Sequence, residues 1–109
     1  MITAHSLDTT YRALADPSRR AMIRQLARKQ SLSVSELAKP LPLALPTVLK
    51  HIDVLVHAGL VERTKSGRVV TVTLRPDGMA EAMAWLEKTE SFWSSRLTRL
   101  ASMARQGKL

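Results

Sequence analysis

Residues 43–74 join an amphipathic helix to an alternating basic hairpin, and this order restricts the folds open to the chain. At about 100° per residue, the apolar side chains of the helix fall within roughly a third of its circumference. They are Leu45, Val48, Leu49, Ile52, Leu55 and Val56. Ala58-Gly59 ends the helix, because glycine readily adopts the left-handed cap. The helix therefore packs by one face, and the side chains that point elsewhere are Thr47, Lys50, His51, Asp53 and His57.

The hairpin that follows has a basic tip. Two alternating segments flank Ser66-Gly67, a dipeptide suited to a tight turn. Arg63, Lys65 and Arg68 surround this turn. Cations there can reach phosphate or the minor groove, and glycine lets the backbone come close. A solvated basic hairpin without a ligand is the alternative interpretation.

Two helices are predicted at the amino-terminal end. Apolar residues at helical spacing indicate a first helix over about residues 7–15. Asp16-Pro17 separates it from a second helix, because aspartate caps a helix and proline is tolerated in its first turn. Arg19 and Arg20 lie on the basic flank of this second helix, where they can touch phosphate, pair with Asp16 or face solvent.

A third, short helix completes a known arrangement of helices. Ser33-Val34-Ser35-Glu36 fits the capping box, in which serine and glutamate side chains accept from each other's backbone amides. The two prolines that follow Lys39 end this helix. Pro46 begins the next one, with Leu45 or Ala44 as a cap residue that has no capping side chain. Helix, tight connection, second helix and hairpin is the order of a winged helix-turn-helix.

The last helix carries an apolar seam. From Met79 onward, apolar residues recur four and three apart, as in a heptad repeat, with only Glu90 interrupting. A helix of about 25 residues is about 38 Å long, more than a chain of this size needs for its own core. We therefore expect the seam, together with Leu7 and Tyr11, to pair two copies of the chain. A purely intrachain core is the alternative.

The net charge of +8 is concentrated in the part of the chain that contains the helix and the hairpin. Residues 1–75 contain 12 Lys/Arg and 5 Asp/Glu, a net +7, whereas residues 76–109 contain 5 and 4, a net +1. A localised basic region is typical of nucleic-acid binders. RNA, an anionic membrane surface or an acidic protein would also suit such a region.

Several classes of protein are excluded by the composition. Without cysteine the chain forms no disulfide, thiolate metal site or cysteine nucleophile. It has no Gly-rich phosphate loop, nucleophile motif or clustered carboxylates, so neither an enzyme nor a cofactor is expected. His51 and His57 lie about 120° apart around their helix and cannot readily share a metal. With no apolar run near about 18 residues and no signal-peptide layout, we expect a cytoplasmic protein with no membrane partner.

Five segments are spread over residues 11–100: YRALADPSRRAMIRQL, LSVSELA, LPTVLKHIDVLVHAGLV, RTKSGRVVTVTL and WLEKTESFWSSRLTRL. In this order and spacing the chain resembles the ArsR-type (ArsR/SmtB) winged-helix transcriptional repressors. The last segment is similar to a metal-independent, autorepressor-like branch. The resemblance implies a dimer with paired first and last helices, and recognition helices that enter successive major grooves of an operator.

The chain departs from the family pattern at two places. Many members carry serine and glutamine where this chain has Ala44 and Leu45, and serine at Leu49, all used at or near the DNA. These three side chains supply no hydrogen bonds, so Leu45 and Leu49 either contact bases or pack in the core. Metal-sensing members use cysteines near the third helix or a His/Asp/Glu cluster on the last helix. This chain has no ligand thiol in LSVSELA and no histidine in its last helix.

We therefore predict one mainly α-helical domain over residues 1–109, with four helices, a small β-hairpin and a last helix. Residues 1–15 and 78–105 are the predicted dimerisation helices, 33–58 the helix-turn-helix and 60–75 the wing. The predicted DNA contacts are Pro46, Thr47, Leu49, Lys50, His51, Arg63, Lys65, Ser66, Gly67 and Arg68. The predicted dimer interface contains Leu7, Tyr11, Met79, Met83, Leu86, Trp93, Leu97 and Leu100.

The predicted function is that of a homodimeric, sequence-specific repressor of transcription that binds a double-stranded DNA operator. Its recognition helix, about 46–58, enters the major groove, and its wing, 63–68, contacts phosphate or the minor groove. No metal and no cofactor take part, and the sequence identifies no small-molecule inducer. The alternative is a winged-helix protein-interaction module with little specific DNA binding.

Overall fold

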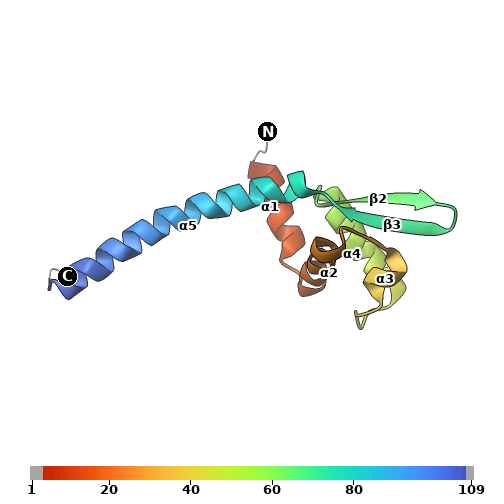
Figure 1. Cartoon of the computed structure of the whole chain (residues 1–109), viewed down its shortest axis with the longest axis horizontal. Helices are drawn as coiled ribbons and strands as arrows, with labels where there is room; N and C mark the ends of the chain where they lie inside the picture. The colour runs from red at the N-terminus through yellow and green to blue at the C-terminus, as the bar shows by residue number, and fades with distance from the viewer. Residues whose placement is uncertain (1–3, 108–109) are drawn as a thin grey trace.

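The computed structural model describes residues 4–107 and has the predicted winged helix-turn-helix architecture (Figure 1). The helices are α1 (Ala4–Leu14), α2 (Pro17–Lys29), α3 (Val34–Ala38), α4 (Leu45–His57) and α5 (Pro76–Arg105). The strands are β1 (Ser31–Ser33), β2 (Val61–Ser66) and β3 (Val69–Leu74). Residues 1–3 and 108–109 of the predicted domain lie outside the described residues. No helix within residues 4–107 is long and apolar enough to cross a membrane.

The sheet has three antiparallel strands in the order β1-β3-β2, one more than the predicted hairpin. β1 pairs with β3 through Leu32 and Val72, and it is too short to show an alternating pattern of its own. The hairpin turn is Gly67-Arg68, one residue later than predicted, because Ser66 pairs with Val69. Gly67 has φ +61°, which suits a two-residue turn with glycine at its first position.

Local capping signals predicted the starts of α2, α3 and α4, whereas α1 and α5 begin earlier than the predicted residues 7 and 78. The Ser33 hydroxyl accepts from the N–H of Glu36 at 3.1 Å, and the Glu36 carboxylate accepts from the N–H of Ser33 at 2.9 Å. The predicted capping box is therefore present. Helix α4 begins at Leu45 with Ala44 as a cap residue that makes no side-chain bond, which is the second of the two predicted starts. Gly59 has φ +75° at the end of this helix, as predicted.

The core lies where α2, α3 and α4 pack against the sheet. Its largest fully buried side chains are Met22, Leu26, Leu37, Val48, Ile52, Leu55, Leu60, Val61 and Val72. The expectation that Leu45 and Leu49 share the packing face of α4 is wrong, because they are 53% and 39% exposed. Both lie on the flank of α4 turned toward the wing, which the core does not cover.

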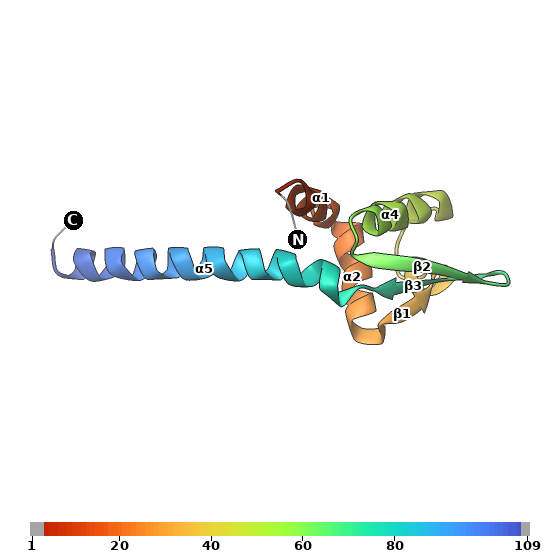
Figure 2. The ribbon, with the colours of Figure 1, turned by 90° about the horizontal axis from the view of Figure 1, so that it is seen from above.

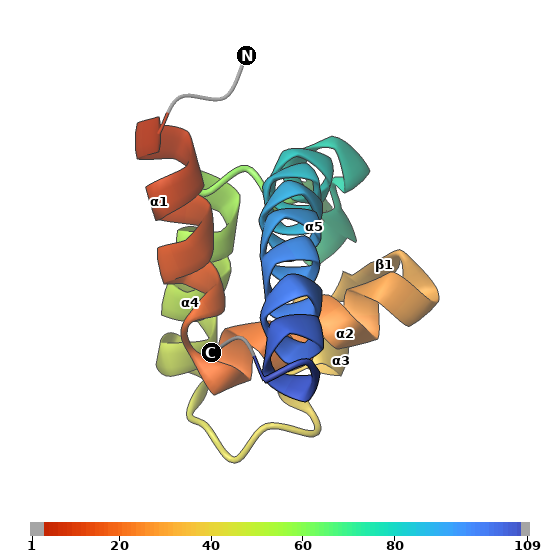
Figure 3. The same ribbon diagram turned by 90° about the vertical axis from the view of Figure 1, so that its left-hand side faces the viewer.

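Helix α5 leaves the body and makes the molecule elongated, 67 × 33 × 22 Å (Figures 1 and 2). Its first turns pack beside α1 (Figure 3). There the Tyr11 hydroxyl donates to the carbonyl of Ala82 at 2.7 Å. The ring of Tyr11 also meets Trp85 edge to face. Residues 90–101 are all exposed, so the second half of α5 lies outside the core of this chain.

Helix α5 is set against the body at its first turn through Gly78. A methyl group at Gly78 would lie 2.0 Å from the carbonyl oxygen of Gly59 and 3.3 Å from the Cα of Leu60. The N–H of Arg75 donates to the carbonyl of Leu60 at 2.8 Å in the same corner. Glycine is therefore required at this position by the close approach of two backbones.

Candidate nucleic-acid interface

The front of α4, the start of α3 and the wing together line one open groove of about 330 Å³. Val34 and Ser35 line it from α3, Leu45 and Leu49 from α4, and Arg68 and Val69 from the wing. The wing and α3 lie at the end of the molecule remote from the carboxyl end of α5 (Figure 1). The fold therefore brings the front of the predicted recognition helix and Arg68 of the predicted wing into one groove.

Most of the predicted DNA contacts are exposed on this surface. On α4 the exposed ones are Pro46, Thr47, Leu49 and Lys50, and on the wing they are Arg63, Lys65, Ser66, Gly67 and Arg68. The cations of the wing tip come close to α4 at Arg68, which lines the groove. Positive side chains beside an exposed helix end provide the electrostatic basis for binding phosphate.

The side chain of His51 does not point outward, contrary to the prediction. It is 16% exposed, and its Nε2 lies 3.9 Å from the Asp16 carboxylate. Its Nδ1 lies 3.1 Å from Nη1 of Arg19. Because a guanidinium can only donate, Nδ1 accepts in this geometry and the imidazole proton is on Nε2. His51 therefore holds α4 against the start of α2.

Arg19 and Arg20 both bond to the end of α1, although Arg20 itself is exposed to solvent. Nε of Arg19 donates to the carbonyl of Ala13 at 2.6 Å, and Nη1 of Arg20 donates to those of Leu14 and Ala15 at 2.9 Å. These carbonyls end α1 and have no partner further along the helix. The two arginines therefore cap α1, and the Arg19 guanidinium also carries the contact to His51. The expected pairing of these arginines with Asp16 takes another form, since the Asp16 carboxylate accepts from the backbone N–H of Arg19.

Arg63 forms an ion pair with Asp53, which joins β2 to α4. Both side chains are substantially exposed, so this pair contributes little to stability. The pair is one link between the wing strand β2 and the recognition helix α4. The sequence offered no signal for this pair, because Asp53 and Arg63 are ten residues apart in different elements.

Asp16 caps α2, and this contribution to stability should depend on pH. Burial acts to raise the pKa of Asp16, but hydrogen bonds from the backbone N–H groups of Arg19 and Ser18 hold the pKa below its ordinary value of 3.8. Because the folded-state pKa is lowered, the stabilisation is complete above about pH 3.8 and is lost as the pH falls through the folded-state pKa.

We expect Asp16→Ala to lower the free energy of unfolding by about 1 kcal/mol at neutral pH. Asp16→Asn, whose amide oxygen can still cap, should lose less stability than wild type between neutral and acidic pH. Chemical denaturation at both pH values measures these differences. Equal acid sensitivity of wild type and Asp16→Asn would show that this carboxylate does not contribute.

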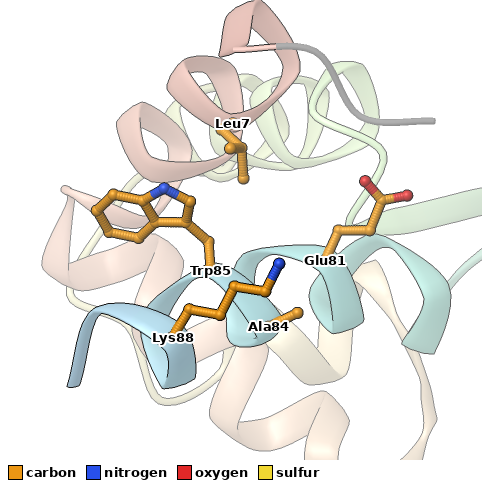
Figure 4. Close-up of a pocket in the computed structure, with 5 residues that line it drawn as sticks. All are labelled: Leu7, Glu81, Ala84, Trp85 and Lys88. Atoms are coloured by element: carbon orange, nitrogen blue, oxygen red, sulfur yellow. The ribbon is translucent and has the colours of Figure 1, made fainter. Parts of the chain in front are cut away.

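The exposed face of α5 is apolar along most of its length. Of the predicted interface residues, Met83, Leu86, Trp93, Leu97 and Leu100 are exposed, together with Trp85 and Phe92 beside them. Met79 packs against the core of its own chain. Leu7 faces Trp85 across a shallow hollow between α1 and α5, with Glu81, Ala84 and Lys88 on its α5 side (Figure 4). Such a large exposed apolar strip on a small domain is typical of an interaction surface.

Metal-ligating side chains are not clustered in the described part of the chain. Within residues 4–107, no three His, Asp or Glu side chains lie close enough to hold one ion. His57 is exposed on α4, and His51 is engaged with Arg19.

Known proteins are similar to this chain over most of its length. A family model described as a helix-turn-helix domain matches residues 14–64. The HTH-type transcriptional regulator Rv2034 of Mycobacterium tuberculosis is 38% identical over 103 residues, which cover 94% of this chain and 92% of that protein.

Solved structures agree with this comparison. An ArsR family transcriptional regulator, RHA00566, is 38% identical with a TM-score of 0.78, and the match covers 86% of this chain and 96% of that chain. An ArsR-like transcriptional regulator from Rhodococcus sp. RHA1 is 29% identical with a TM-score of 0.70, covering 92% of this chain and 93% of the other. The similarity therefore extends well beyond the matched helix-turn-helix segment.

Proposed function

Because the chain belongs to the ArsR family of helix-turn-helix transcriptional regulators, we propose that it is a homodimeric repressor that reads an operator through α4 and the wing. Members of this family are DNA-binding regulators of transcription and not enzymes. The observation that carries the proposed mode of binding is the common surface formed by the front of α4 and the wing. Helix α4 enters the major groove, and the wing follows phosphate or the minor groove.

Separate roles follow for the exposed residues of this surface. Lys50, Lys65 and Arg68 contact phosphate and give affinity that depends on salt. Thr47 lies in the first turn of α4, where a hydroxyl can bond to a base edge or a phosphate. Arg63 and His51 position the wing and α4, since each is engaged with a neighbouring element.

The dimer rests on the exposed seam of α5. Trp93 and Leu97 belong to a strip of large apolar side chains that this chain leaves uncovered. A second copy related by a two-fold axis would cover the same strip on both partners. The two α4 helices would then be offered to successive major grooves of a palindromic operator. A dimer seated on a promoter excludes other proteins from that DNA, which is the simplest route to repression.

Binding to the chain's own promoter region, followed by mobility shift across a range of salt concentrations, tests this proposal. We expect Lys50→Ala to weaken binding, to leave the dimer intact and to lower the slope of log affinity against log salt by about one. Arg24→Ala is the matched control, because Arg24 is an exposed cation on α2 away from the groove. Equal affinity for unrelated duplexes would refute sequence-specific binding. If Lys50→Ala binds DNA with the affinity of the wild type, Lys50 does not contact the DNA.

We also propose that the repressor works without a metal. The chain has no cysteine, and α5 contains no histidine, so the two kinds of metal-sensing site described above lack their ligands. Operator affinity should therefore be the same, within error, after chelation and after addition of zinc. A change of about tenfold or more on adding zinc would contradict metal independence while leaving DNA binding itself intact.

A further inference from the structure

Three large apolar side chains are exposed at the front of the proposed DNA-binding surface. Leu45, Leu49 and Val69 are 53%, 39% and 54% exposed and line the same groove. Leu45 and Leu49 are one turn apart on one flank of α4. Neither leucine can donate or accept a hydrogen bond, so any ligand recognised there is recognised by apolar contact.

The surroundings of these apolar side chains favour DNA over a protein partner. Arg68 lines the groove itself, and Lys50 follows Leu49 on the exposed side of α4. Among the described residues that line the groove, none is acidic. The cores of protein–protein interfaces are depleted of charge, whereas a DNA major groove has phosphates at its edges and base edges on its floor.

We infer that Leu45 and Leu49 read the C5 methyl groups of thymines in the operator. This inference rests on the proposed function, since it requires α4 to enter the major groove. The amino-terminal residues of a recognition helix contact base edges, and Leu45 is the first residue of α4. The thymine methyl is the apolar group that the four standard bases present in the major groove. The operator therefore carries thymine where these leucines meet it.

Removing single methyl groups tests this inference. A duplex that the wild-type chain selects from a random-sequence library is resynthesised with each thymidine in turn replaced by deoxyuridine. We expect about one or two positions in each half-site where affinity falls about fourfold, the effect of losing one buried methyl group. Each leucine that contacts a thymine methyl should account for the loss of affinity at one of these positions. In Leu45→Ala or Leu49→Ala, the affinities for the thymine duplex and the uracil duplex should become equal at the position that the replaced leucine contacts, as in a double-mutant cycle.

Val54→Ala is the matched control. Val54 is 39% exposed on α4, like Leu49, but it faces α1 across a separate hollow. This variant should keep the full preference for thymine. Equal affinity for thymine and uracil duplexes at every position, with selective binding retained, would overturn the inference and leave the proposed function standing. Failure to select any sequence would refute the proposed function itself, and the inference with it.

Discussion

Leu97→Glu is expected to convert the protein to a monomer and to lower its operator affinity about 100-fold or more. Leu97 is 60% exposed and lies in the α5 seam between Trp93 and Leu100. In the proposed dimer the glutamate would be buried without a partner, at a high cost in free energy. A monomer binds one half-site and loses the second binding event that the dimer makes intramolecular. Sedimentation equilibrium gives the mass, and mobility shift gives the affinity.

Thr98→Glu is the control for this change. Thr98 is the next residue, is exposed and lies about 100° further around the helix, away from the seam. This variant carries the same added charge and should stay dimeric. The combined emission of Trp85 and Trp93 should shift to longer wavelength in Leu97→Glu alone, because the interface would no longer cover the ring of Trp93. A Leu97→Glu protein that remains a dimer would place the interface elsewhere.

Gly78→Ala should destabilise the fold by about 3 kcal/mol or more. Its methyl group would lie 2.0 Å from the Gly59 carbonyl oxygen, which is a backbone atom and cannot rotate away as a side chain can. Relief of the clash requires α5 to move off the corner that joins α4 to β2. We expect the midpoint of thermal unfolding to fall by roughly 10–20 °C at equal protein concentration.

Gly67→Ala is the control for Gly78→Ala, because it replaces a glycine by alanine without creating a clash. Gly67 has φ +61° at the hairpin turn, and a methyl group there would meet nothing within 4 Å. Its replacement should cost about 1 kcal/mol, from backbone strain alone. A Gly78→Ala protein no less stable than Gly67→Ala would mean that the two backbones approach less closely than described.

Features encoded by neighbouring residues could be predicted from the sequence. The Ser33 capping box and the left-handed Gly59 each depend on a few adjacent residues, and the structure has both. The predicted alternation along β3 is not seen in its burial, because only Val72 is fully buried and its neighbours on both faces are half-buried. Strand β1 depends instead on β3, about forty residues later, since its ladder partners lie there. The three residues of β1 are too few to show a periodic pattern, so the sequence did not predict this strand.

The site was predicted less completely. A helical wheel gives the direction of each side chain around the helix axis, but it does not show which other element packs against that side chain. Leu49 lies near the edge of the apolar stripe, and the wheel cannot show that no element covers that edge. His51 lies on the opposite edge, where Arg19 reaches it from 32 residues away. The exposed cations of the wing needed no such information, since a hairpin tip is exposed wherever the hairpin packs.

The bonds of Arg19 give the molecule an internal linkage. One guanidinium holds the last carbonyls of α1 and the imidazole on α4 together. Helix α1 also lies on α5 through Tyr11. Contacts of α1 and of α4 with α2 are therefore supplemented by one side chain that bonds to both α1 and α4. In the proposed dimer, Arg19 would connect the helices that pair the two copies with the helix that reads the operator.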